Sequence, residues 1–199
     1  MARLQLSKAQ LAKETAALAR YRRYLPALDL KRKQLIAERN RARTRLAEAE
    51  RAIAARVEAI GAEIPMLANT EIDLAGLARV ARLEVGERNL VGVRVPVLVR
   101  LEVEIAPYGY MLRPHWVDLA AERLREVVRR EVEARLLREE IALLDAAVTK
   151  VMQRVNLFEK VLIPRARTRI ARIRIALGDA ERAGVVTSKI AKRKREAAA

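Results

Sequence analysis

Residues 141–162 read IALLDAAVTKVMQRVNLFEKVL, and apolar side chains recur in them at alternating steps of three and four residues. The seam consists of Ile141, Leu144, Val148, Val151, Val155, Phe158 and Leu162. This spacing keeps the apolar side chains on one helix face and makes the helix supercoil about a partner. Because a seam of this length has to be buried, we expect a long helix over about residues 116–177 that pairs with a second long helix.

The N-terminal stretch supplies the expected partner, because residues 4–60 carry a second heptad pattern. One seam position holds leucine or isoleucine except at two arginines: Leu4, Leu11, Leu18, Leu25, Arg32, Arg39, Leu46, Ile53 and Ile60. The companion position holds Tyr21, Leu28, Leu35, Ala42 and Ala49. Pro26 removes a backbone hydrogen bond inside this pattern, so the helix either kinks at Pro26 or begins there. Gly61 and Pro65 end the pattern.

Residues 65–113 change from helical spacing to alternation, which is typical of β-strands. Residues 81–85 alternate apolar and charged side chains, and every odd position of residues 91–105 is apolar. The intervening Gly-Glu-Arg-Asn, residues 86–89, is expected to turn, and Pro96 places its strand at an edge or a bulge. A two-stranded hairpin is marginal by itself in water, so it must pack on the helices or on another protein.

These patterns predict a mainly α-helical fold, in which the N- and C-terminal helices form a long antiparallel two-helix coiled coil. Both termini are expected at one end and a small β-hairpin-containing middle segment at the other. We divide the chain into an N-terminal coiled-coil helix (1–64), a middle segment with the hairpin (65–113), a C-terminal coiled-coil helix (114–178) and a basic tail (179–199). Pro164 interrupts the C-terminal helix. The two steps of four residues from Phe158 to Ala166 predict a stutter that unwinds the supercoil locally. Gly178 and Gly184 are expected to loosen the end of this helix.

The net charge of +16 is the strongest compositional feature of the chain. A charge of this size attracts nucleic acid, anionic lipid or an acidic protein surface. Basic residues gather around Pro26, on the outward face after Pro164 and near the C-terminus. The candidate contact residues are Arg22, Arg23, Lys31, Arg32, Lys33, Arg165, Arg167, Arg169, Arg172, Lys189, Lys192, Arg193, Lys194 and Arg195.

The sequence predicts no catalytic residues, no cofactor and no metal site. Cysteine is absent and His115 is the single histidine, which excludes thiol chemistry and a multi-histidine metal site. The carboxylate pairs Glu131/Glu133 and Glu139/Glu140 are interpreted as a solvated helix face. No apolar run approaches the ~18 residues of a membrane span, and the first residues lack the apolar core of a signal peptide. We therefore expect a cytoplasmic protein.

Three segments resemble the D subunit of the V-type (vacuolar/archaeal-type) rotary ATPases. Residues 154–164, RVNLFEKVLIP, resemble the signature of that family's C-terminal helix, and residues 89–97, NLVGVRVPV, resemble its central segment. Residues 28–35, LDLKRKQL, are similar to its N-terminal basic motif. The matching positions are Arg154, Val155, Asn156, Phe158, Glu159, Ile163 and Pro164 in the first segment, and Asn89, Gly92, Val93 and Pro96 in the second.

The resemblance implies a non-catalytic central rotor shaft, peripheral to the membrane in the soluble ATPase sector. It implies that the coiled-coil end with both termini enters the hexamer of A and B subunits, and that the rest binds the F subunit and the funnel-shaped C (or d) subunit. The basic residues named above would then make a sliding contact inside the hexamer, without binding nucleic acid or inserting into the membrane.

Other functions compete with the rotor shaft. The gamma shaft of F-type ATPases shares the helix–middle–helix plan but has a larger middle domain. A basic coiled-coil protein that is structural or binds nucleic acid would show strongly salt-dependent binding without sequence preference. A membrane-surface helix is disfavoured because both seams require partner helices.

Overall fold

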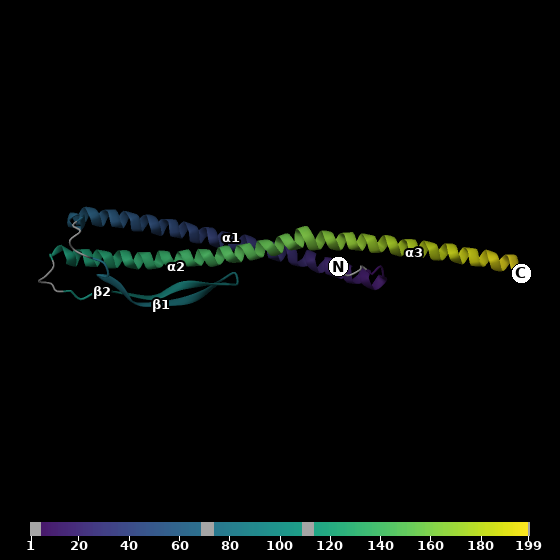
Figure 1. Cartoon of the computed structure of the whole chain (residues 1–199), viewed down its shortest axis with the longest axis horizontal. Helices are drawn as coiled ribbons and strands as arrows, with labels where there is room; N and C mark the ends of the chain where they lie inside the picture. The colour runs from purple at the N-terminus through teal and green to yellow at the C-terminus, as the bar shows by residue number, and fades with distance from the viewer. Residues whose placement is uncertain (1–4, 69–73, 109–113, 199) are drawn as a thin grey trace. The chain divides into compact units, whose positions relative to one another are not determined.

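The computed structural model describes residues 5–68, 74–108 and 114–198. Helix α1 (Lys8–Glu63) is followed by a 3₁₀-helix (Pro65–Ala68), strands β1 (Ala78–Leu90) and β2 (Val93–Ile105), helix α2 (Trp116–Asn156), a π-helix (Leu157–Leu162) and helix α3 (Ile163–Ala198) (Figure 1). The predicted mainly helical fold with an antiparallel hairpin is therefore confirmed. The chain divides into two compact units, the terminal unit (residues 1–32 and 150–199) and the central unit (residues 33–149).

Helix α1 begins with a side-chain cap. The Ser7 hydroxyl oxygen accepts a hydrogen bond from the backbone N–H of Gln10 at 3.2 Å, which satisfies one of the free N–H groups of the first turn. Pro26 lies inside the continuous helix, so the alternative that the helix begins at Pro26 is wrong. Since Pro26 has no N–H, the Arg22 carbonyl lacks its usual donor within the helix.

Antiparallel pairing in the terminal unit brings α1 against the end of α2, the π-helix and α3. The ring of Tyr21 meets that of Phe158 edge-on, with centroids 5.4 Å apart. Further along, the Glu14 carboxylate contacts the Arg169 guanidinium at 3.0 Å, and Lys8 lies 3.5 Å from Glu181. The buried apolar residues of this seam are Val151, Val155, Ile163, Ala166, Ile170 and Ile173.

The π-helix takes up one extra residue in this seam. After Val155 the fully buried positions resume at Ile163 and continue through Ala166, Ile170 and Ile173 in steps of three and four, whereas Leu162 is only partly buried. The Ile163 N–H donates to the Phe158 carbonyl, five residues back, as in a π-helix. Where we expected a locally unwound supercoil at a stutter, the structure instead widens one helical turn directly before Pro164.

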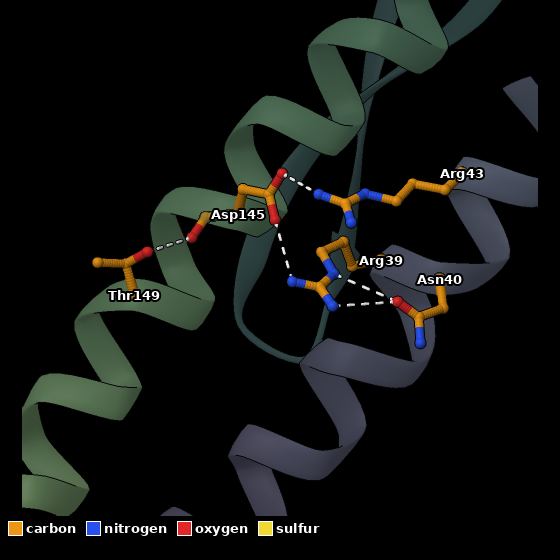
Figure 2. Close-up of polar contacts among 5 residues, drawn as sticks. All are labelled: Arg39, Asn40, Arg43, Asp145 and Thr149. Carbon is orange, nitrogen blue, oxygen red and sulfur yellow. Dashed lines mark hydrogen bonds and ion pairs between the residues drawn. The ribbon is translucent and has the colours of Figure 1, made fainter.

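In the central unit α1 pairs with α2 in the same antiparallel sense. Leu35, Ala42, Ala134 and Leu144 are completely buried, which confirms the helical seams. Ion pairs join the two helices at successive levels: Arg39 and Arg43 with Asp145, Arg45 with Glu140, Glu50 with Arg138, Arg56 with Glu126, and Glu63 with Arg123. Figure 2 shows the first of these levels, where both arginines of α1 reach one carboxylate of α2.

The hairpin turns at Val91 and Gly92, because Leu90 pairs with Val93. Both turn residues have positive φ, 54° and 80°, as a two-residue hairpin turn of type I′ requires. The Asn89 side-chain oxygen accepts a hydrogen bond from the Gly92 N–H at 2.7 Å and stabilises the turn. Our prediction of a turn at residues 86–89 is wrong, since these residues belong to β1 and pair with residues 94–97.

The base of the hairpin packs on the helix ends of the central unit, which is the first of the two alternatives that the sequence left open. Its core cluster consists of Ile60, Ile64, Leu77, Trp116, Val117, Ala120 and Ala121. Ile105 and Tyr108 cover this cluster, and the Tyr108 hydroxyl bonds the Asp118 carboxylate in the first turn of α2. Residues 109–113, which we assigned to the middle segment, lie outside the described residues.

Candidate functional site: the charged surfaces

The net charge of the chain is distributed very unevenly between the two units. Residues 1–32 and 150–199 contain 22 Lys and Arg against 6 Asp and Glu, whereas residues 33–149 contain 19 of each kind. The terminal unit therefore carries the whole net charge of +16, and the central unit is neutral. Any electrostatic attraction to an acidic partner is concentrated on the terminal unit.

Most of the predicted contact residues are free to meet a partner. Nine of them are exposed and form no ion pair within the part of the chain that the structure describes: Arg22, Arg23, Arg165, Arg167, Arg172, Lys189, Arg193, Lys194 and Arg195. Lys31 is partly buried, Arg32 pairs with Asp29 at 2.6 Å, and Lys192 lies 3.8 Å from Glu196. Lys33 belongs to the central unit.

Arg169 differs from the other predicted contact residues because it is engaged inside the terminal unit. Its guanidinium donates to the carboxylate of Glu14, which is 8% exposed and also accepts from the Gln10 amide. Glu14 stands at the companion position of the α1 heptads, seven residues before Tyr21. A buried polar residue at one seam position is a common means of fixing helix register, so we assign Arg169 to the seam.

Helix α3 continues past the last contact with α1. Figure 1 shows this extension of α3 past α1, and every residue of 182–197, beyond the pair of Lys8 and Glu181, is exposed. Residues 179–198, which we set apart as a tail, are helical, and the helix runs through Gly178 and Gly184. Exposed apolar residues at Val185, Val186 and Ile190 alternate with its basic residues. An isolated helix of about this length is only marginally stable in water.

Many charged residues of the central unit are paired with one another across α1 and α2. The hydrogen bond from Arg123 lowers the pKa of the Glu63 carboxyl below its ordinary value, and that from Arg56 lowers the pKa of Glu126. Arg138 bonds Glu131 and Glu50, and these bonds raise the pKa of its guanidinium. The α1–α2 pair is therefore crosslinked by side chains along its length.

Glu140 is the functional candidate that the sequence reasoning missed. We interpreted it as part of a solvated face, but it is 3% exposed and lies 2.9 Å from Arg45 of α1 and 3.7 Å from Arg88 of β1. The signal was present in the spacing, because Glu140 stands four residues before Leu144 and thus at the margin of the seam. Its neighbour Glu139, like Glu131 and Glu133, is exposed as expected.

The two family-like segments occupy defined places. In residues 154–164, Val155 and Ile163 are buried and Phe158 packs on Tyr21, while Arg154, Asn156, Glu159 and Pro164 are exposed around the π-helix. In residues 89–97 the motif forms the hairpin tip, where Gly92 lies in the turn and the Asn89 side chain accepts its N–H. Val93 and Pro96 continue into β2.

No group of three or more His, Cys, Asp or Glu in residues 5–68, 74–108 and 114–198 could hold a metal ion. In the same ranges no helix has an apolar stretch long enough to cross a bilayer.

Comparison with known proteins gives a consistent result over nearly the whole chain. Residues 10–193 match the family model of the ATP synthase D subunit. The V-type ATP synthase D subunit of Borreliella burgdorferi is 34% identical over 196 residues, covering 96% of this chain and 95% of its own. The proteins of the same name from Chlamydia felis and Chlamydia caviae are 33% and 30% identical, each covering 96% of this chain and 93% of its own.

Proposed function

Because this chain belongs to the ATP synthase D-subunit family, we propose that it is the central stalk, or rotor shaft, of a V-type ATPase or ATP synthase. In this role it transmits torque between the catalytic A/B hexamer and the ion-translocating ring in the membrane. It performs no catalysis itself, and it stays in the cytoplasm as a peripheral part of the soluble ATPase sector.

The observation that carries the proposal is the division of charge. A shaft that turns inside a ring needs attraction to the ring without tight side-chain locks. The exposed, unpaired arginines and lysines of the terminal unit supply such attraction, because each exposed ion pair is worth only ~0–1 kcal/mol and is readily exchanged. The residues proposed to face the hexamer are Arg22, Arg23, Arg165, Arg167, Arg172, Lys189, Arg193, Lys194 and Arg195.

The neutral central unit is proposed to bind the other stalk partners, the F subunit and the funnel-shaped C (or d) subunit. Its helices are joined by ion pairs at five successive levels, from Arg39 and Arg43 with Asp145 to Glu63 with Arg123. We expect pairs at several levels to resist relative sliding of the two helices, because sliding by one turn would break all of them at once. This suits a part of the shaft that is held by its partners and turns with them.

The test is co-expression of this chain with the A, B and F subunits, followed by size-exclusion chromatography and an ATPase assay. We expect one copy of the chain to elute with three copies of A, three of B and one of F. A chain that stays apart from a well-formed A/B hexamer would contradict the shaft function.

Nucleic-acid binding is the second candidate, favoured by the concentration of charge on the terminal unit. It predicts that the isolated chain retards duplex DNA in a gel-shift assay at low salt. The logarithm of the binding constant should then fall linearly with the logarithm of the salt concentration. A shift that persists at physiological salt, together with failure to join the hexamer, would favour this candidate over the shaft.

A further inference from the structure

The tip of the hairpin is held to the helices by one carboxylate that is shared between two arginines. The Glu140 Oε1 atom lies 2.9 Å from Arg45 Nη2 and 3.7 Å from Arg88 Nη2. The side chain of Glu140 is only 4% exposed, whereas those of Arg45 and Arg88 are 45% and 49% exposed. The two guanidiniums therefore share one carboxylate acceptor, and Glu133, which lines the same pocket, forms no ion pair with either of them.

In the neighbouring Asp145 cluster, two arginines also share one carboxylate, but a further hydrogen-bond acceptor is present there. Asp145 also serves two arginines, but Arg39 has a further acceptor, since its Nε and Nη2 atoms donate to the Asn40 side-chain oxygen at 3.3 and 3.1 Å (Figure 2). The guanidinium of Arg88 makes no hydrogen bond to any residue that the structure describes, because its 3.7 Å contact with Glu140 is too long for one. Arg88 therefore has unused donors.

Both arginines also line an open hollow that Glu140 does not line. It measures about 470 Å³ and is lined by Glu38, Arg41, Thr44, Arg45, Arg88 and Leu90. The Glu38 carboxylate forms an ion pair with the Arg41 guanidinium at 2.7 Å. The remaining charged groups that line the hollow, those of Arg45 and Arg88, are positive. The apolar rim at Leu90, next to the turn, suits a protein side chain better than a free anion.

We propose that Arg45 and Arg88 form a receptor for a carboxylate side chain of a partner protein that binds against the hairpin tip. Glu140 is the internal anion that holds the tip when the partner is absent. The partner presents an aspartate or glutamate to the two guanidiniums, with an apolar neighbour against Leu90. This inference rests on the proposed function, because it takes the partner from the stalk proteins of the same complex.

The test titrates the intact chain with the purified F subunit and, separately, with the purified C subunit. Loss of a charge-assisted hydrogen bond at an interface weakens binding substantially. We expect Arg88→Gln and Arg45→Gln to raise the Kd for one of the two partners about tenfold or more. The matched control is Arg94→Gln, which removes a hairpin arginine that is 81% exposed and pairs with Glu87 at 3.6 Å. Its Kd should stay within twofold of the wild type.

A second variant separates a direct contact from a mere effect on the hairpin. Glu140→Gln breaks the internal pair but leaves both arginines free, so binding should be as tight as in the wild type or tighter. If Glu140→Gln weakens binding as much as Arg88→Gln does, the arginines act only by holding the hairpin and the receptor is overturned. Unchanged binding by Arg88→Gln overturns it as well.

Entry of the chain into the A/B hexamer tests the proposed function separately from the carboxylate receptor. If the wild-type chain enters the A/B hexamer but binds neither F nor C, the carboxylate receptor is overturned and the shaft function stands. If the chain does not enter the hexamer, the shaft function itself fails.

Discussion

At the scale of single residues, burial decides which of the many charges matter for stability. The pair of Glu14 and Arg169 has side-chain exposures of 11% and 36%, whereas the pair of Lys8 and Glu181 in the same unit has 68–81%. When one residue of a shielded ion pair is removed, the remaining charge is left without compensation for its lost hydration. When one residue of an exposed pair is removed, the remaining charge is hydrated instead.

We therefore predict that a double-mutant cycle of Glu14→Gln and Arg169→Gln gives a coupling of about 1 kcal/mol in thermal unfolding. The same cycle with Lys8→Gln and Glu181→Gln serves as the control and should give no measurable coupling. Equal coupling in the two cycles would show that Glu14 is not a seam residue.

A second residue-scale prediction concerns acid. Glu63 and Glu126 have pKa values lowered by hydrogen bonds from Arg123 and Arg56. A carboxyl whose pKa is lower in the folded state stabilises that state above its unfolded pKa, and this contribution is lost as pH falls through the folded value. We expect Glu63→Gln to lower the melting temperature at pH 7. The difference between the melting temperatures at pH 7 and pH 3 should also be smaller in this variant than in the wild type. Glu58→Gln, at an exposed position without an ion pair among the described residues, should leave that difference unchanged.

At the scale of elements, the π-helix explains why the heptads on its two sides are out of step. One extra residue between Val155 and Ile163 is absorbed by a wider turn directly before Pro164, whose missing N–H already weakens the α-helical bonding there. Deleting the exposed Val161 should therefore convert this turn to α-helix and keep Ile163, Ala166 and Ile170 on the seam.

We predict that this deletion keeps or raises the melting temperature. Deleting the exposed Arg167 instead moves Ile170 and Ile173 off the seam, and should cost several kcal/mol, at ~2–5 kcal/mol for each large apolar side chain that loses its burial. Circular dichroism melts of the two variants compare these costs directly. If both deletions cost the same, the extra residue is not located in the π-helix.

The same element bears on torque. If the irregular turn at Pro164 gives the shaft the asymmetry that makes the three catalytic sites differ, Pro164→Ala should alter ATP-driven rotation or its coupling to ion pumping in the assembled complex. Unchanged rotation and pumping would contradict this role for Pro164.

At the scale of the whole molecule, a single chain combines one strongly basic unit with one unit of zero net charge. We predict that replacing Arg165, Arg167 and Arg172 together by glutamine weakens association with the A/B hexamer about tenfold or more and leaves the melting temperature unchanged, since all three are exposed and unpaired among the described residues. The control replaces Arg125, Arg129 and Arg130 of the central unit, which removes the same charge. Equal weakening by both variants, measured at two salt concentrations, would show a general effect of net charge.

The helices, their seams, the hairpin and the family could be predicted from the sequence, because heptad spacing, alternation and short motifs are local patterns. Three features emerged with the folded structure: Glu140 is buried between two arginines, Arg169 pairs with a seam residue, and the turn lies at Val91 and Gly92. Each of these depends on which residue of one element faces which residue of another. Glu140 and Arg45 are 95 residues apart, and the periodicity of either helix is the same whichever charges meet across the interface.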